Sequence, residues 1–178
     1  MAERQIALLR GINVGRAKRV SMADLRALFE TLGYTDVATL LQSGNVVFSG
    51  RVGASTPSRI EKAMVETLGV TSRITLLSAS ELGQAIKENP LTRVAHNPSR
   101  HMIAILKDPA DRKRLALMSK EDWSPEVFAL GKRVAYFWCP DGILESRIAK
   151  AIDRSLGDRV TTRNWTTLNK LGELAAKR

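Results

Sequence analysis

The spacing of apolar and polar positions in the first half of the chain predicts alternating strands and helices. Short apolar runs indicate strands at residues 5–9, 37–41, 46–48 and 72–77, and helical spacing of apolar residues indicates helices at 21–32 and 55–68. Ser21 favours a helix N-cap, and Gly33 and Gly69 follow the two helical patterns, where glycine commonly ends a helix. This β-α-β-β-α-β order is the split βαβ arrangement of ferredoxin-like domains.

The second half repeats this order with different residues. Strands are expected at 101–106, 126–130 and 133–139, with a short fourth strand at 159–162, and helices at 109–118, 146–156 and from Trp165 onward. A helix at 80–87 and a linker at 88–99, which contains Pro90 and Pro98, separate the halves. The predicted fold class is α+β with two consecutive small α+β domains. We expect a ferredoxin-like (βαββαβ) domain over 1–78, a helix and linker over 79–98, and over 99–178 a related βαββα unit with an added C-terminal helix.

Length and composition fit this fold class. The chain has 178 residues, of which 44% are hydrophobic, enough for two small packed cores. No apolar run approaches the roughly 20 residues of a membrane span, and residues 1–20 lack the apolar core of a secretory signal, so we expect a cytoplasmic protein. The single cysteine, Cys139, excludes an internal disulfide.

The charge balance is strongly basic. The 28 Lys and Arg residues outnumber the 18 Asp and Glu residues, which gives a net charge of +10. The excess is shared between the halves, with 10 basic and 6 acidic residues in 1–78 and 16 and 10 in 99–178. Such an excess favours phosphate-bearing partners. The alternative is a solvated surface that keeps the protein soluble.

The segment Arg10–Arg19 joins the first strand to the first helix and carries four basic residues and no acidic one. Its glycines allow backbone N–H groups to approach an anion, and the following helix N-terminus should add partial positive charge. The P-loop and dinucleotide-binding glycine patterns are both missing, which argues against nucleotide hydrolysis. The alternative is an ordinary solvated loop.

The predicted topology brings this loop to a hairpin. In a split βαβ unit, the end of strand 1 and the hairpin between strands 2 and 3 lie at the same sheet edge. Arg10–Asn13 should therefore lie beside Gln42–Asn45. Together the two segments would surround one small concavity with hydrogen-bonding groups, among which no general base is obvious. The alternative is that these groups only bond one another.

A second polar cluster covers residues 161–167. Asn164 or a neighbouring threonine can cap the last helix, Arg163 can hold a carboxylate or phosphate, and Trp165 can stack on a ring. The alternative for Trp165 is burial in the core.

Two further candidates are weaker. Tyr136 and Trp138 follow the basic Lys132-Arg133 turn, an arrangement that resembles single-stranded RNA binders, but the RNP1 pattern is missing and burial is the alternative. His96, His101 and Cys139 do not have zinc-ligand spacing, and Cys139 is expected to be a buried, inert thiol. We expect no metal and no cofactor.

Three segments closely resemble the motifs of the domain-of-unknown-function 1697 (DUF1697) family. They are Ala7–Gly15 (ALLRGINVG), Leu41–Phe48 (LQSGNVVF) and Thr161–Trp165 (TTRNW), and the resemblance spans nearly the whole chain. It implies two consecutive α+β domains, the first ferredoxin-like, in a family whose members are mostly bacterial, and it supplies no activity. The family usually has a glycine where this chain has Arg16, which makes the loop here stiffer and more basic.

These observations leave three hypotheses open. The first is binding of an anionic partner, either a phosphorylated small molecule or a nucleic acid, near the Arg10 loop and the Gln42–Asn45 hairpin. The second is an enzyme of unknown reaction that uses Gln42, Asn45 and Arg163 to orient a small substrate. The third is a purely structural role. The candidate ligand-binding residues are Arg10, Gly11, Asn13, Gln42, Ser43, Gly44, Asn45, Arg163, Asn164 and Trp165.

Overall fold

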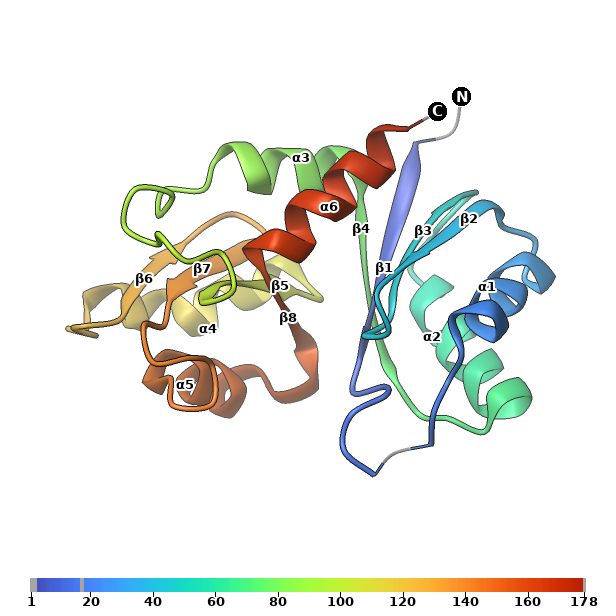
Figure 1. Cartoon of the computed structure of the whole chain (residues 1–178), viewed down its shortest axis with the longest axis horizontal. Helices are drawn as coiled ribbons and strands as arrows, with labels where there is room; N and C mark the ends of the chain where they lie inside the picture. The colour runs from blue at the N-terminus through green and yellow to red at the C-terminus, as the bar shows by residue number, and fades with distance from the viewer. Residues whose placement is uncertain (1–2, 17, 178) are drawn as a thin grey trace. The chain divides into compact units, whose positions relative to one another are not determined.

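A computed structural model describes residues 3–16 and 18–177 (Figure 1). Contacts within the chain group it into two compact units. Unit 1 contains the residues up to Ser80 together with those from Leu171 on, and unit 2 contains Glu81–Lys170. The division into a domain over 1–78, a helix and linker over 79–98 and a second domain over 99–178 stays a prediction.

Unit 1 is built on a four-stranded antiparallel sheet of order β2-β3-β1-β4. Strand β3 therefore lies between β1 and β2, as the predicted order of elements requires. Helices α1 and α2 cover one face of this sheet (Figure 1). The elements are β1 (Arg4–Arg10), α1 (Met22–Thr31), β2 (Thr35–Leu40), β3 (Asn45–Ser49), α2 (Thr56–Ala63) with a π-helical turn η1 (Met64–Leu68), and β4 (Arg73–Ser78).

The core of unit 1 follows from the two periodicities of its sequence. Alternate strand residues such as Leu9 and Phe48 face the helices, and residues at helical spacing such as Leu25 and Phe29 face the sheet. The Ser21 hydroxyl accepts a hydrogen bond from the Asp24 amide at 3.0 Å, which confirms the predicted N-cap of α1.

Unit 2 contains a second four-stranded antiparallel sheet, of order β6-β7-β5-β8. Strand β8 gives this sheet the same order as the first, so the βαββα unit is extended by a fourth strand. The fold is mixed α+β, as predicted. The elements are α3 (Ala79–Lys87), β5 (His101–Leu106), η2 (Pro109–Asp111), α4 (Arg112–Leu115), η3 (Ala116–Lys120), β6 (Val127–Leu130), β7 (Val134–Trp138), α5 (Arg147–Leu156), η4 (Gly157–Arg159), β8 (Val160–Asn164) and α6 (Trp165–Ala176).

Helices α4 and α5 supply the apolar residues that cover one face of the second sheet. Leu115 from α4 and Ile148 and Ile152 from α5 pack with Ala104 and Phe137 of the sheet. Helix α6 begins in unit 2 and ends in unit 1. None of the helices among the described residues is long and apolar enough to cross a membrane.

Candidate functional site

The carboxamide of Asn13 shapes the loop between β1 and α1. Its Oδ1 accepts from the Val20 amide at 2.7 Å, and its Nδ2 donates to the Val20 carbonyl at 2.9 Å and to the Gln42 carbonyl at 2.8 Å. Asn13 has a φ of 54°, in the left-handed region that asparagine tolerates better than most residues. One side chain thus closes the loop and joins it to the β2–β3 turn.

The turn itself is seated against the end of β1. The Leu9 amide donates to the Gly44 carbonyl at 2.8 Å, which confirms that strand 1 and the hairpin meet at one sheet edge. Gly44 has a φ of +83°, and a Cβ at this position would lie 2.7 Å from Ile12 Cδ1. Only glycine therefore fits both the backbone conformation and the space.

Asn45 is fully buried below this turn. Its Nδ2 donates to the Leu40 carbonyl at 2.8 Å and to the Ser43 hydroxyl at 3.0 Å. The carboxamide of Asn45 therefore holds the turn together and is not presented to solvent, whereas the side chains of Gln42 and Ser43 are exposed.

The side chains of Arg16, Lys18 and Arg19 are exposed, and those of Lys18 and Arg19 donate to neutral acceptors. Lys18 Nζ donates to the Leu68 carbonyl at 2.7 Å, and Arg19 Nη1 donates to the Asn13 carbonyl at 2.9 Å. Among the described residues, no acidic side chain pairs with Arg16, Lys18 or Arg19. Three positive charges therefore stand un-neutralised on one loop. Ala17, within the same predicted loop, lies outside the described residues.

Two details modify the predicted electrostatics. Asp24 lies in the first turn of α1, so its negative charge offsets the partial positive charge expected from that helix N-terminus. Arg10 faces Arg73 across the β1–β4 pair, and Arg73 in turn pairs with Glu61, with 3.3 Å between Nη1 and Oε2. Gly11, with a φ of 79°, lets the chain turn away directly after Arg10.

The second candidate cluster lies in unit 2. Asn164 Oδ1 accepts from the Thr167 amide at 2.9 Å, which makes Asn164 the predicted cap of α6. The Trp165 ring stacks on the ring of His101, with centroids 5.1 Å apart and planes at 22°. Arg163 donates from Nη1 to the Thr162 carbonyl at 3.0 Å, and burial lowers the pKa of Arg163 to about 10, so the side chain stays charged at neutral pH.

The sequence analysis weighed His101 only as a zinc ligand and did not include it among the candidate ligand-binding residues. It is fully buried, its Nε2 lies 3.1 Å from Asn89 Nδ2, and its Nδ1 has no hydrogen-bond partner among the described residues. Burial lowers the pKa of His101 to about 4, so the ring is neutral at physiological pH. The signal in the sequence is that His101 is the first residue of β5, whose other residues are all apolar.

The aromatic hairpin does not offer a stacking surface. Tyr136 and Trp138 are buried, and the Tyr136 hydroxyl donates to the Ala85 carbonyl at 2.7 Å. Cys139 is also buried, and burial raises the pKa of its thiol to about 11, which makes it a poor nucleophile. Within the described part of the chain, no three His, Cys, Asp or Glu side chains gather as a metal site.

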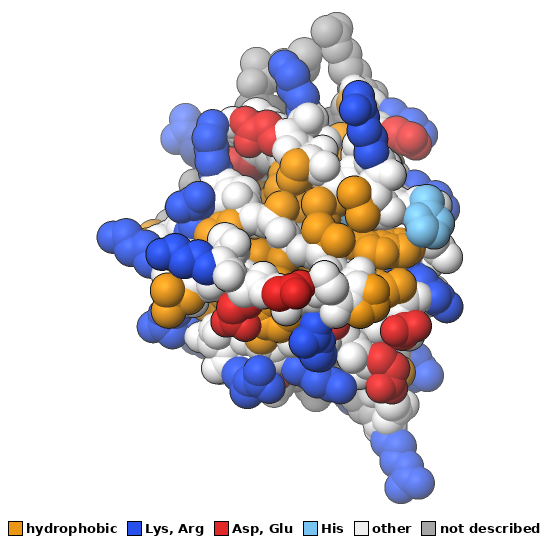
Figure 2. All heavy atoms as spheres, turned by 90° about the vertical axis from the view of Figure 1, so that its left-hand side faces the viewer, with side chains coloured by type: hydrophobic (Ala, Val, Ile, Leu, Met, Phe, Trp, Pro, Cys, Tyr) orange, Lys and Arg blue, Asp and Glu red, His pale blue; other side chains and the backbone are white. Residues whose placement is uncertain are grey.

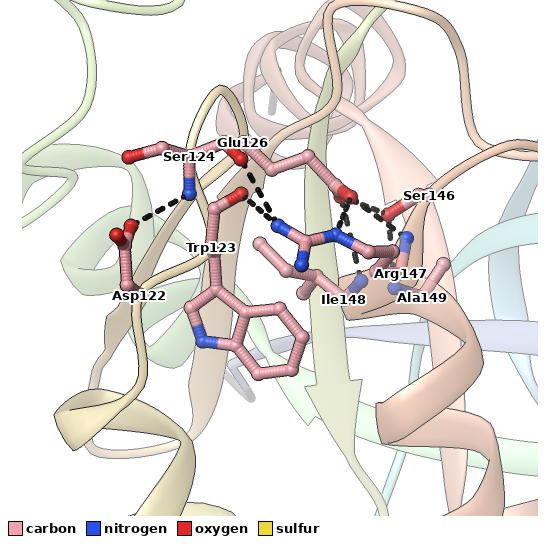
Figure 3. Close-up of polar contacts among 8 residues, drawn as sticks. All are labelled: Asp122, Trp123, Ser124, Glu126, Ser146, Arg147, Ile148 and Ala149. Atoms are coloured by element: carbon pink, nitrogen blue, oxygen red, sulfur yellow. Dashed lines mark hydrogen bonds and ion pairs between the residues drawn. The ribbon is translucent and has the colours of Figure 1, made fainter.

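The N-terminus of α5, another place where an anion can bind, is filled by the protein's own carboxylate (Figure 3). Glu126 accepts from the Ser146 hydroxyl at 2.5 Å and from the Arg147 amide at 2.7 Å. Arg147 also donates to the Trp123 carbonyl at 2.6 Å. These contacts hold the start of β6 to α5, and the Glu126 carboxylate takes up the donors that an external anion would need.

A hollow of about 710 Å³ lies at the other end of the first sheet, beside Arg4. The Arg4 guanidinium donates to the Asp36 carbonyl and to the Lys177 carbonyl, both at 2.8 Å. Its two terminal nitrogens hold β2 to the end of α6, whereas its Nε is buried without a hydrogen-bond partner among the described residues. The Arg10–Arg19 loop carries several exposed cations and remains the stronger candidate for binding a phosphate.

Comparison with known proteins identifies the family. The sequence profile described as "Protein of unknown function (DUF1697)" matches residues 2–136 of the 178. The chain belongs to the DUF1697 family. The matched residues include the first two motifs of the sequence analysis, and the Thr161–Trp165 motif lies beyond them.

A solved structure with a similar fold also exists. The structure of the conserved bacterial protein SP0830 from Streptococcus pneumoniae is similar, with a TM-score of 0.79 at 22% sequence identity, over 99% of this chain and 100% of the other. At this identity the likeness shows the fold alone. The comparison with curated proteins gives no match.

Proposed function

We propose that this DUF1697 protein binds a phosphate-bearing partner through the Arg10–Arg19 loop and the adjoining Gln42–Asn45 turn. The observation that carries the proposal is the presence of Arg16, Lys18 and Arg19 on one short loop without an acidic partner among the described residues. Phosphates attract such charges over several ångströms and hydrogen-bond to them on contact.

The loop is built to keep these charges in place. Asn13 closes it with three hydrogen bonds, and Lys18 and Arg19 are anchored to backbone carbonyls that leave their charges intact. A pre-shaped loop loses less conformational entropy on binding than a mobile one. Several exposed cations along a loop favour a partner with several phosphates, and single-stranded nucleic acid is the simplest of these.

The enzyme hypothesis draws less support from the same residues. Asn45, one of the groups expected to orient a substrate, is fully buried and its Nδ2 is bound within the turn. Asn13 is equally committed to the backbone. These two residues fit the structural hypothesis, and the exposed cations of the loop fit binding.

The test compares two double variants in a binding titration. Arg16→Gln/Lys18→Gln removes two charges from the loop. Arg26→Gln/Arg51→Gln removes two exposed charges from elsewhere in unit 1 and is the matched control. Fluorescence anisotropy with labelled single-stranded RNA and DNA, at low and physiological salt, measures polyanion binding, and calorimetry with nucleoside mono- and diphosphates measures binding of small phosphates.

The proposal expects the loop variant to weaken binding about tenfold or more, as two lost phosphate contacts imply, and the control to change it less than threefold. If binding weakens equally in both variants, the interaction depends on the net charge of the protein and not on this loop. If the wild-type protein binds none of the probes at physiological salt, the proposal is wrong and the structural hypothesis gains.

A further inference from the structure

Two apolar side chains are exposed where the Arg10–Arg19 loop meets the β2–β3 turn. Val14 on the loop is 65% exposed, and Leu41 on the turn is 51% exposed. Each is next in sequence to one of two residues that a hydrogen bond joins, since Asn13 Nδ2 donates to the Gln42 carbonyl at 2.8 Å. The two apolar side chains therefore lie on segments that this bond holds together within the candidate site.

The backbone of Leu41 has an unfavourable conformation. Its φ is 59°, in the left-handed region that leucine rarely adopts because Cβ comes too close to a backbone carbonyl. The Asn45 carboxamide fixes the chain directly before it, because Nδ2 donates to the Leu40 carbonyl at 2.8 Å. Burial does not offset this strain, since the leucine side chain stays half-exposed. A strained residue that keeps an apolar side chain in water indicates a contact outside the chain.

The cations of the loop indicate what kind of partner makes this contact. Arg16, Lys18 and Arg19 pair with no acidic side chain among the described residues. Figure 2 shows a basic side chain projecting at the bottom of the view, where this loop lies in Figure 1. A partner that satisfies both the cations and the apolar pair carries phosphates beside apolar surface. A single-stranded nucleic acid exposes both its phosphates and its base faces, whereas a duplex stacks the base faces inside.

An anionic membrane also combines phosphates with apolar groups, but this apolar pair is too small to anchor a protein there. Val14 and Leu41 together hold fewer carbon atoms than one myristoyl chain, which by itself gives only marginal membrane binding. Leucine side chains do insert between the bases of nucleic acids. The aromatic residues of unit 1, Phe29, Tyr34 and Phe48, are buried, so they offer no stacking surface and leave base contacts to the aliphatic pair.

We propose that Leu41 and Val14 pack against the bases of a single-stranded nucleic acid whose phosphates bind the cations of the loop. This inference rests on the proposed function and names its partner. Phosphate contacts alone favour a duplex, which has the higher charge density, whereas base contacts favour a single strand. The protein should therefore bind a single strand more tightly than a duplex of the same length.

Fluorescence anisotropy of the full chain with three labelled probes of equal length tests the base contact. The probes are oligo(dT), the same strand with abasic sites in place of its bases, and the duplex of oligo(dT) with oligo(dA). Leu41→Asn removes the apolar side chain, and asparagine tolerates positive φ. It should weaken binding of oligo(dT) about fivefold and of the abasic strand less than twofold, while the protein unfolds at no lower a urea concentration than the wild type.

Three other variants complete the test. Val14→Asn should show the same selectivity for the strand that carries bases, and it decides the question if Leu41→Asn fails to fold by circular dichroism. Leu144→Asn removes an 84% exposed leucine from a turn in unit 2 and should bind both strands like the wild type. Arg16→Gln/Lys18→Gln should weaken binding of both strands alike, because it removes phosphate contacts only.

A loss confined to the strand that carries bases supports the inference. If the asparagine variants weaken both strands equally or neither, or if the wild type prefers the duplex, the inference is overturned, whereas a loss with Arg16→Gln/Lys18→Gln still supports the proposed function. If the wild type binds neither strand at physiological salt, both are wrong. Sedimentation with phosphatidylglycerol vesicles tests the other partner: vesicle binding that Leu41→Asn weakens, without a loss on oligo(dT), assigns the apolar pair to a membrane and overturns the inference.

Discussion

Replacing Asn13 by alanine should destabilise the candidate loop strongly, because three hydrogen bonds converge on one carboxamide. The substitution leaves the N–H and C=O of Val20, which is 4% exposed, without their partner, and frees the Gln42 carbonyl. Each bond contributes about 1 kcal/mol net. The left-handed backbone at φ 54° costs alanine roughly another 1 kcal/mol. The expected loss in the free energy of unfolding is therefore about 3–4 kcal/mol.

The substitution Asn13→Gly separates these two contributions. Glycine loses the same hydrogen bonds but adopts positive φ freely, so it should be about 1 kcal/mol less destabilising than alanine. If the bonds matter and the backbone strain does not, the two variants should have equal stability. The comparison thus tests the conformation of the loop as well as its contacts.

Urea unfolding followed by far-UV circular dichroism measures these losses, and tryptophan fluorescence supplies a reference. All three tryptophans, Trp123, Trp138 and Trp165, lie in unit 2, so their fluorescence reports that unit. Hydrogen exchange at the Val20 amide, which donates to Asn13, reports the loop directly. An Asn13→Ala protein within 0.5 kcal/mol of wild type, with unchanged protection of Val20, would refute the reasoning.

Three other substitutions test separate parts of the structure. Gly44→Ala should lower the free energy of urea unfolding by about 2–4 kcal/mol, because its Cβ would meet Ile12. Gly33→Ala, at a similar φ of +89° but in open space, should lower it by only about 1 kcal/mol. Equal losses in the two variants would contradict the close packing at Gly44. Because His101 is buried and neutral, the unfolded state gains its proton between pH 6.5 and 4 before the folded state does, so the free energy of unfolding should fall by about 3 kcal/mol over this range. His101→Gln should remove this part of the pH dependence of the unfolding free energy. If the variant keeps the same pH dependence, burial of His101 is not the cause. Tyr136→Phe should lower the free energy of unfolding by about 1 kcal/mol and speed hydrogen exchange in α3, because the Ala85 carbonyl of this helix accepts from the Tyr136 hydroxyl. Unchanged exchange would show that this hydrogen bond does not stabilise the helix.

Local chemistry made much of the fold predictable. Ser21 caps α1, Gly33 and Gly69 follow their helices with positive φ, and Asn164 caps α6, all of which depend on residues close in sequence. The meeting of the Arg10 loop with the hairpin was also predictable, because the order of elements fixes which strand ends share an edge.

The roles within the site depend on contacts that the sequence does not encode locally. In the sequence, Asn13 and Asn45 resemble exposed binding groups in a polar loop. In the structure their carboxamides bond backbone carbonyls, Asn13 that of Val20, seven residues on, and Asn45 that of Leu40, five residues back. The stacking partner of Trp165 is His101, 64 positions earlier in the chain, which only the second sheet brings into contact. Helix α4 with its flanking 3₁₀ turns, and the π-helical turn after α2, likewise arise from packing that apolar spacing does not specify.

The salt dependence of nucleic-acid binding tests the central claim most directly. For single strands the slope of log K against log salt is about −0.7 per phosphate contact, so loss of two contacts should reduce its magnitude by about 1.4. We predict this reduction for Arg16→Gln/Lys18→Gln and an unchanged slope for Arg26→Gln/Arg51→Gln. Equal slopes for the wild type and the loop variant would contradict the claim that this loop contacts the phosphates.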